Sequence, residues 1–169
     1  YFKTKEAPTI REAIAKLFNA ISKQVEPLVS HLDGLLEALH TEACDAVLRS
    51  YEGVLQSVFR GNSGRWAKPG EARMMCCKEF EAVLTSADAF NDAFLARDVT
   101  YAFQIGLQLY PDELFDLEFA QMSFLEFLHG LGAAVYLRSE PGALAERLDS
   151  LARKLAESEG IGNLLKSFK

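Results

Sequence analysis

Apolar residues recur at spacings of three and four through most of the chain, a pattern typical of α-helices. The first run covers residues 10–25, where Thr9 and Glu12 form a T-x-x-E capping box. Pro27 ends or kinks this helix, and the apolar run that follows to His40 fits either a bent continuation or a separate helix. The segment 1–42 is therefore predicted to supply N-terminal helices that pack on the core.

The same periodicity predicts further helices, separated by glycine-rich and proline-containing turns. They cover residues 43–59, 75–85, 97–109, 123–137 and 143–157. Three glycines and a proline between positions 61 and 71 predict a loop. The connector 112–121 fits either a short helix or an extended piece, and residues 160–169 fit one or two further turns. Convincing β-alternation is lacking, so the predicted class is all-α.

An internal repeat organises the middle of the chain. Residues 75–84 and 122–131 carry Met, Glu, Phe and Leu at the same offsets, and another predicted helix precedes each copy. The pattern predicts two helix-loop-helix units within residues 43–138, flanked by the N-terminal segment 1–42 and a C-terminal helical extension, 139–169. Four phenylalanines at equivalent places are expected to meet in the core: Phe59, Phe80, Phe103 and Phe127.

The repeat resembles the EF-hand fold, because each loop has a hydrophobic residue at position eight and a glutamate at position twelve, followed by phenylalanine. The helix at residues 122–131 is similar to the closing helix of degenerate, calcium-free EF-hands in the tubulin polymerisation-promoting family and in ciliary and flagellar proteins. This resemblance implies a non-catalytic, structural protein-protein interaction module of an axonemal or microtubule-associated assembly. It also implies a cytoplasmic, cytoskeletal location, with the cilium or flagellum as a candidate. Tubulin and axonemal proteins are the candidate partners.

The loop residues argue against calcium binding. Counting back from Glu126, positions one, three and five hold Phe115, Leu117 and Phe119, which offer no side-chain oxygen. Counting back from Glu79, the same positions hold a lysine, a glycine and an alanine. Glu79 and Glu126 suit the first turn of a helix instead, where a carboxylate caps backbone N–H groups, and Ser123 with Glu126 forms a second capping box. No metal or other cofactor is expected.

Charge and composition narrow the class of partner. Hydrophobic residues make up 49% of the chain and the formal net charge is -6, so the chain should form a core and has no positive field for nucleic acid. An odd number of cysteines, two of them adjacent, indicates a reducing compartment. No apolar run approaches a membrane span, and the opening residues resemble neither a signal peptide nor an initiator methionine, so we expect a portion of a longer protein.

Catalytic signatures are absent from the sequence. The histidines His31, His40 and His129 form no ligand motif, and Cys76 and Cys77 lack the signature of a nucleophile. The alternatives to a calcium-free interaction module are a calcium-responsive EF-hand regulator and a helical subunit of another large intracellular complex. An enzyme or carrier whose pocket is assembled from dispersed residues is a third possibility.

Two segments are candidate partner-binding sites, where aromatic residues stand among acidic or flexible ones. An acidic, phenylalanine-bearing segment suits docking onto a basic partner or folding back as a lid, with a solvated loop as the alternative. The predicted partner-binding residues are Trp66, Asp112, Glu113, Phe115, Asp116 and Phe119. The leucine stripe of residues 143–157 suits packing within the chain or pairing with a partner helix.

Overall fold

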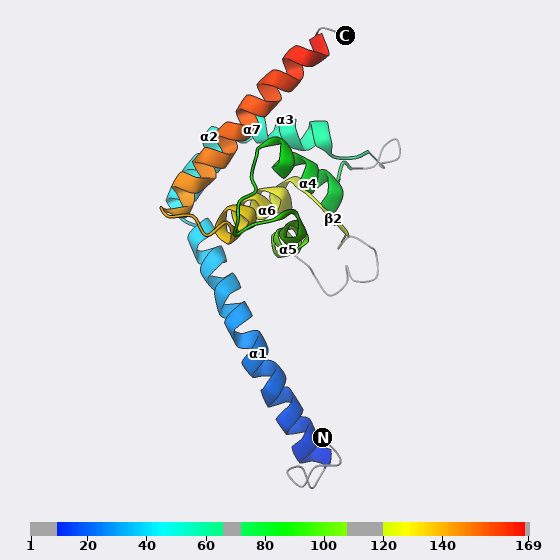
Figure 1. The fold of residues 1–169 in the computed structure, drawn as a ribbon, viewed down its shortest axis with the longest axis vertical. Helices are drawn as coiled ribbons and strands as arrows, with labels where there is room; N and C mark the ends of the chain where they lie inside the picture. The colour runs from blue at the N-terminus through cyan, green and yellow to red at the C-terminus, as the bar shows by residue number, and fades with distance from the viewer. Residues whose placement is uncertain (1–9, 66–71, 108–119, 168–169) are drawn as a thin grey trace. The chain divides into compact units, whose positions relative to one another are not determined.

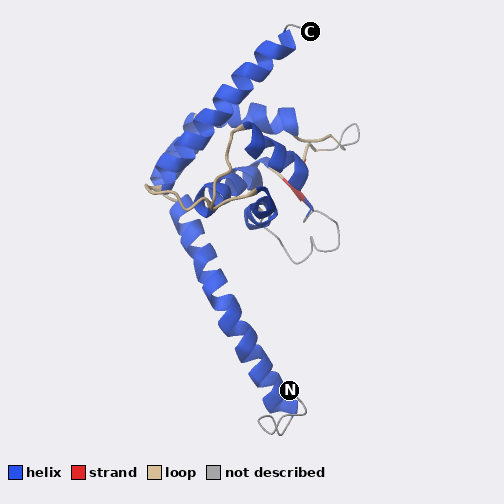
Figure 2. Cartoon of the chain, viewed as in Figure 1, coloured by secondary structure: helices blue, strands red, loops and turns tan. Residues whose placement is uncertain are grey.

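The computed structural model describes residues 10–65, 72–107 and 120–167, without the side chains of residues 23–33 and 161–167. The described part of the chain is mostly helical, with 75% helix in eight helices (Figure 2). It also contains one small sheet of two strands. It divides into two compact units, Tyr1–Glu37 and Ala38–Lys169.

The first unit consists of most of helix α1, Ile10–Leu39. Of the two alternatives at Pro27, a continuation is found and a separate helix is not, because α1 continues through the proline. One proline removes a single backbone donor, and the turns on either side keep their own hydrogen bonds. Apolar residues at helical spacing form an exposed stripe on the N-terminal half of α1: Ile10, Ile14, Leu17, Phe18 and Ile21.

The second unit begins with two helices where the sequence predicts one. Helix α2 covers Glu42–Ser50 and α3 covers Glu52–Asn62. The break falls at Tyr51, where the Val47 carbonyl accepts both the hydroxyl of Ser50 at 2.7 Å and the N–H of Tyr51 at 3.2 Å. Gly53 in the first turn of α3 adds a residue of low helix propensity.

The two copies of the repeat follow. Strand β1 (Met75–Cys76) leads into α4 (Cys77–Ser86), the 3₁₀ helix η1 (Ala96–Asp98) leads into α5 (Val99–Gly106), and β2 (Gln121–Met122) leads into α6 (Phe124–Leu137). Helix α3 packs against α4 and α6, and α5 packs against α4 and α6 (Figure 1). Four helices thus form one body around a shared core.

The predicted phenylalanine cluster is confirmed. Phe59, Phe80, Phe103 and Phe127 are all buried. The ring of Phe127 lies 5.6 Å from that of Phe59 and 6.1 Å from that of Phe80, and the Phe80 and Phe103 rings are 6.0 Å apart. Because these residues occupy equivalent places in the two copies, the repeat seen in the sequence corresponds to one shared core in space.

Backbone contact between α5 and α6 is unusually close. A Cβ atom on Gly106 would lie 2.7 Å from the backbone nitrogen of Gly130, so the helices meet at a position where only glycine fits. A Cβ on Gly130 would in turn lie 3.1 Å from the ring of Phe80. These two glycines bring the second copy onto the aromatic core.

The C-terminal helix α7, Leu144–Ser167, completes the unit by packing on α2, α3 and α6. Its leucine stripe, Leu144, Leu148, Leu151 and Leu155, is buried, so the expectation that this helix packs within the chain is confirmed. The turn predicted before it is also present, with positive φ angles at Ser139 and Gly142.

Two further expectations need correction. Residues 75 and 76, predicted as the start of a helix, form β1 instead, because they pair with β2. The helix predicted at 97–109 begins as the 3₁₀ turn η1, and α5 ends at Gly106.

Candidate functional site

The six predicted partner-binding residues fall outside the part of the chain that the structure describes. They are Trp66, Asp112, Glu113, Phe115, Asp116 and Phe119, and Leu117 lies outside it as well. The candidate site therefore rests on two other features of the second unit. One is the place where the two loops meet, and the other is a groove between α2 and α6.

The two loops meet through an antiparallel pair of short strands. Met75 is paired with Met122, and Cys76 with Gln121. The two methionines are the position-eight residues of the repeat, and both are fully buried. The pairing joins the copies through their loops and places the equivalent side chains opposite each other.

Glu79, at position twelve of the first copy, ties the ends of its loop together. One carboxylate oxygen accepts the N–H of Arg65 at 3.1 Å, and the other accepts the N–H of Cys76 at 2.8 Å. The side chain is nearly buried, with 8% of the residue exposed. Both oxygens are thus used to hold backbone N–H groups on either side of the loop.

Arg73 and Glu126 also bind backbone groups at helix ends. Arg73, which occupies position six, donates to the carbonyl of Arg60 at 2.8 Å, so its positive charge lies at the C-terminal end of α3. Glu126 accepts the N–H of Ser123 at 2.6 Å, and the Ser123 hydroxyl accepts the N–H of Glu126. The predicted capping box is therefore confirmed.

A groove between α2 and α6 has a volume of about 850 Å³. Its floor is mainly apolar, from Leu39, Leu48, Phe124, Leu125 and Leu128. Leu125 is 56% exposed, an unusual position for a leucine in the middle of an apolar surface. One wall follows the chain from Thr41 to Glu52, about three helical turns.

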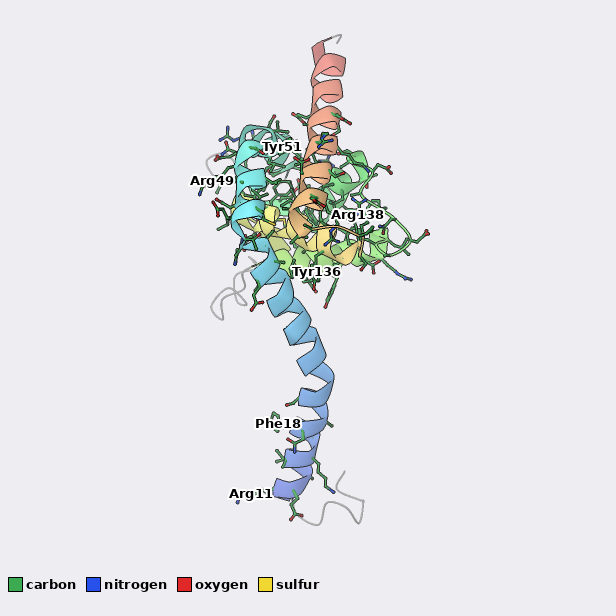
Figure 3. All side chains as sticks on the ribbon, turned by 90° about the vertical axis from the view of Figure 1, so that its left-hand side faces the viewer. Arg11, Phe18, Arg49, Tyr51, Tyr136 and Arg138 are labelled. Carbon is green, nitrogen blue, oxygen red and sulfur yellow. The ribbon has the colours of Figure 1, made fainter. Side chains whose placement is uncertain are left out.

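Acidic residues dominate one rim of the groove. Glu42, Asp45 and Glu52 line it together with a single basic residue, Arg49. Arg49 Nε donates to Asp45 at 2.7 Å, and this hydrogen bond raises the pKa of the guanidinium. The Arg49 charge is thus matched within the rim, which leaves the rim net negative (Figure 3 shows Arg49 on α2).

A pair of histidines lies at the junction of the two walls. The rings of His40 and His129, which are 89 residues apart in sequence, have centroids 5.6 Å apart in an edge-to-face arrangement. Burial lowers the pKa of His129, and the charge of His40 lowers it further, while Glu126 raises it. The groove therefore favours a neutral His129 ring at neutral pH.

The thiols and acids give no sign of a reactive centre. Burial raises the pKa of Cys77, against a smaller lowering effect of its contact with Thr100, so its thiol stays protonated at neutral pH. Within the described ranges, no group of three or more histidine, cysteine, aspartate or glutamate side chains could hold a metal ion.

Sequence reasoning missed the groove and the histidine pair. Its residues come from two helices that are far apart in the chain, and neither stretch contains a motif. The one local signal was the exposed leucine within F-L-E-F-L, which breaks the helical spacing that the core requires, since Phe124 and Phe127 share one face while Leu125 lies beside it.

Neither the search of the described helices for a membrane span nor the comparison with known proteins adds a functional assignment. No helix in the described part of the chain is long and apolar enough to span a membrane. Comparison with protein-family models, with curated proteins and with solved structures gave no match to this chain.

Proposed function

We propose that this chain is a non-catalytic protein-protein interaction module with an EF-hand-like pair of helix-loop-helix units that works without calcium. The observation that carries the proposal is the apolar groove between α2 and α6, which leaves Leu125 exposed beside an acidic rim. Grooves of this kind between helices commonly receive an amphipathic helix of a partner.

The arrangement of the loops supports a calcium-free EF-hand-like unit. The position-eight methionines are paired across the loops, and the aromatic rings that follow position twelve share one core. The carboxylate oxygens of Glu79, which would be needed as calcium ligands, are already used by two backbone N–H groups. The module is thus a constitutively closed scaffold, and its groove is present without a bound ion.

The negative charge of the rim indicates the chemistry of the partner. An apolar floor with carboxylates on its edge favours a helix with leucine or phenylalanine on one face and lysine or arginine beside them. The cytoskeletal setting, with tubulin or axonemal proteins as partners, rests on the resemblance of residues 122–131 to closing helices of such proteins.

A designed peptide tests the groove directly. The probe is a fluorescent amphipathic helix of about four turns with a leucine face and lysine flanks, and its control carries glutamate in place of lysine. We expect the lysine peptide to bind equally well in calcium and in chelator, and more tightly than its glutamate control. Its binding should be lost when the chain carries Leu125→Asp. Equal binding to Leu125→Asp would contradict docking in this groove.

The cytoskeletal setting has a separate test. The wild-type chain and Leu125→Asp are each sedimented with stabilised microtubules. Co-sedimentation that is lost in Leu125→Asp would support direct contact with tubulin through the groove. Absence of both chains from the pellet would remove tubulin as a partner and leave the interaction module intact.

A further inference from the structure

We propose that the groove between α2 and α6 receives the N-terminal half of α1 from a second copy of this chain, so that the protein self-associates. This inference rests on the proposed function, since it names the occupant of the same groove. Two apolar surfaces carry it, each described within its own unit.

The first surface is the apolar stripe of α1. Ile10, Ile14, Leu17, Phe18 and Ile21 recur at spacings of three and four, and all are exposed. Phe18 is 64% exposed, and Figure 3 shows its ring standing out from the helix. Five large apolar side chains on one helix face form a surface that soluble proteins rarely leave uncovered.

The lengths of the two surfaces match. The stripe from Ile10 to Ile21 covers about three helical turns, and so does the groove wall from Thr41 to Glu52. The groove floor offers leucine and phenylalanine side chains, and Leu125 is exposed within it. A helix with apolar residues at i, i+4, i+7, i+8 and i+11 presents the face that such a groove binds.

The charges match as well. The sequence 10–23 contains Arg11, Lys16 and Lys23 against Glu12, so this half of α1 is net positive. The groove rim is net negative through Glu42, Asp45 and Glu52. Opposite net charges favour docking of the helix in the groove, whereas two α1 helices placed side by side in parallel would bring like charges together.

A membrane surface is the main competing occupant of an amphipathic helix. The binding of such helices to anionic lipid depends on a polar face rich in lysine and arginine. By helical spacing the positions opposite the stripe are Glu12, Lys16, Asn19 and Lys23, a set with a net charge of only +1 and thus not rich in lysine and arginine. The structure therefore favours a protein groove as the place where the stripe is buried.

Complementation between two variants tests the proposal in the full chain. Phe18→Asp damages the stripe and leaves the groove intact, whereas Leu125→Asp damages the groove and leaves the stripe intact. Sedimentation velocity and native mass spectrometry should find the wild type self-associated and each variant alone monomeric, with self-association weakened at least about 30-fold, as for a hot-spot residue. An equal mixture of the two variants should form a species with one copy of each.

Matched controls separate a lost contact from a lost fold. Asn19→Asp adds the same charge on the face of α1 opposite the stripe, and Leu95→Asp adds it at an exposed leucine that does not line the groove. Both should self-associate like the wild type. Helical content from circular dichroism should be the same in all four variants.

Each other outcome overturns the proposal. A wild type that is monomeric at all concentrations excludes self-association, and if it then binds vesicles of phosphatidylserine and phosphatidylcholine, the stripe is a membrane-binding surface. Self-association that persists in Leu125→Asp indicates contact between stripes. A mixture that stays monomeric excludes docking between copies. Binding of the lysine peptide to Phe18→Asp distinguishes the two proposals. If the peptide binds while the wild type does not self-associate, the groove is a docking site but a second copy is not its occupant.

Discussion

The contacts described in the two copies of the repeat differ. In the first copy, the carboxylate of Glu79 accepts backbone N–H groups from Arg65 and Cys76, so hydrogen bonds close the loop. In the second copy, α5 and α6 approach until Gly106 lies against the backbone of Gly130. Among the described residues, the first copy thus shows a polar tie between its loop ends and the second a close backbone contact, and a capping glutamate is present in both.

Each copy is therefore vulnerable to a different kind of substitution. A hydrogen-bonded loop depends on one acceptor that cannot be replaced by an apolar group without leaving donors unpaired. A close backbone contact depends on the absence of side-chain atoms and fails when one is added. The two copies share the aromatic core and the β1–β2 pairing, so damage to the core should affect both.

Truncation of the shared core should have the largest effect. Phe80→Ala in the first copy and Phe127→Ala in the second each remove a fully buried ring from the same cluster, and we expect a loss of about 3–5 kcal/mol in the free energy of unfolding for either. Urea denaturation followed by circular dichroism measures it. If one of the two variants lost less than about 1 kcal/mol, the copies would not share a core.

Gly106→Ala should affect the second copy strongly. Its Cβ would lie 2.7 Å from a backbone nitrogen that cannot move by itself, so we expect a loss near the upper end of about 1–3 kcal/mol. Gly53→Ala is the matched control in α3, because nothing lies within 4 Å of its Cβ and a gain of about 0.5–1 kcal/mol is expected. Equal stability of the two variants would refute close packing as the basis of the second copy.

Glu79→Ala should loosen the first copy. It leaves the N–H groups of Arg65 and Cys76 without their acceptor, which costs about 1–3 kcal/mol. Hydrogen exchange at these two amides should accelerate, whereas Glu81→Ala, two residues along the same helix, should leave both rates unchanged. Glu79→Gln keeps one acceptor oxygen and should fall between the two. Unchanged exchange in Glu79→Ala would show that the loop is closed by something else.

The smallest expected effect concerns pH and the groove. Because the pKa of His129 is lowered in the folded state, the unfolded chain binds more protons below the ordinary histidine value of 6.5, and stability should fall as pH falls through that range. His129→Gln should flatten this part of the stability curve. A slope that is the same in both proteins between pH 7 and pH 5 would show that His129 does not carry it.

Sequence patterns predicted the features that local spacing determines. The phenylalanine cluster follows from four residues at equivalent repeat positions, the capping box of Ser123 and Glu126 from their spacing of three, and the burial of α7 from its leucine stripe. Each depends on a periodicity that a single helix fixes before any tertiary contact forms.

The features that escaped prediction depend on contacts between distant segments. The strand at Met75 exists only because Met122 lies opposite it. The groove and the meeting of His40 with His129 depend on how α2 packs beside α6, which neither segment encodes alone. At Pro27 the sequence left a continuation and a separate helix open, and α1 continues because a helix can absorb the loss of one hydrogen bond.

Calcium titration tests whether both helix pairs are held closed without an ion. Amide spectra of the isotope-labelled chain are recorded in chelator and in millimolar calcium, together with thermal unfolding under both conditions. We expect the amides of residues 72–79 and 120–126 to keep their positions and the unfolding temperature to stay the same, because Glu79 already uses both oxygens on backbone N–H groups. A saturable shift of these amides with a rise in unfolding temperature would contradict closure without an ion and make the chain a calcium-responsive regulator.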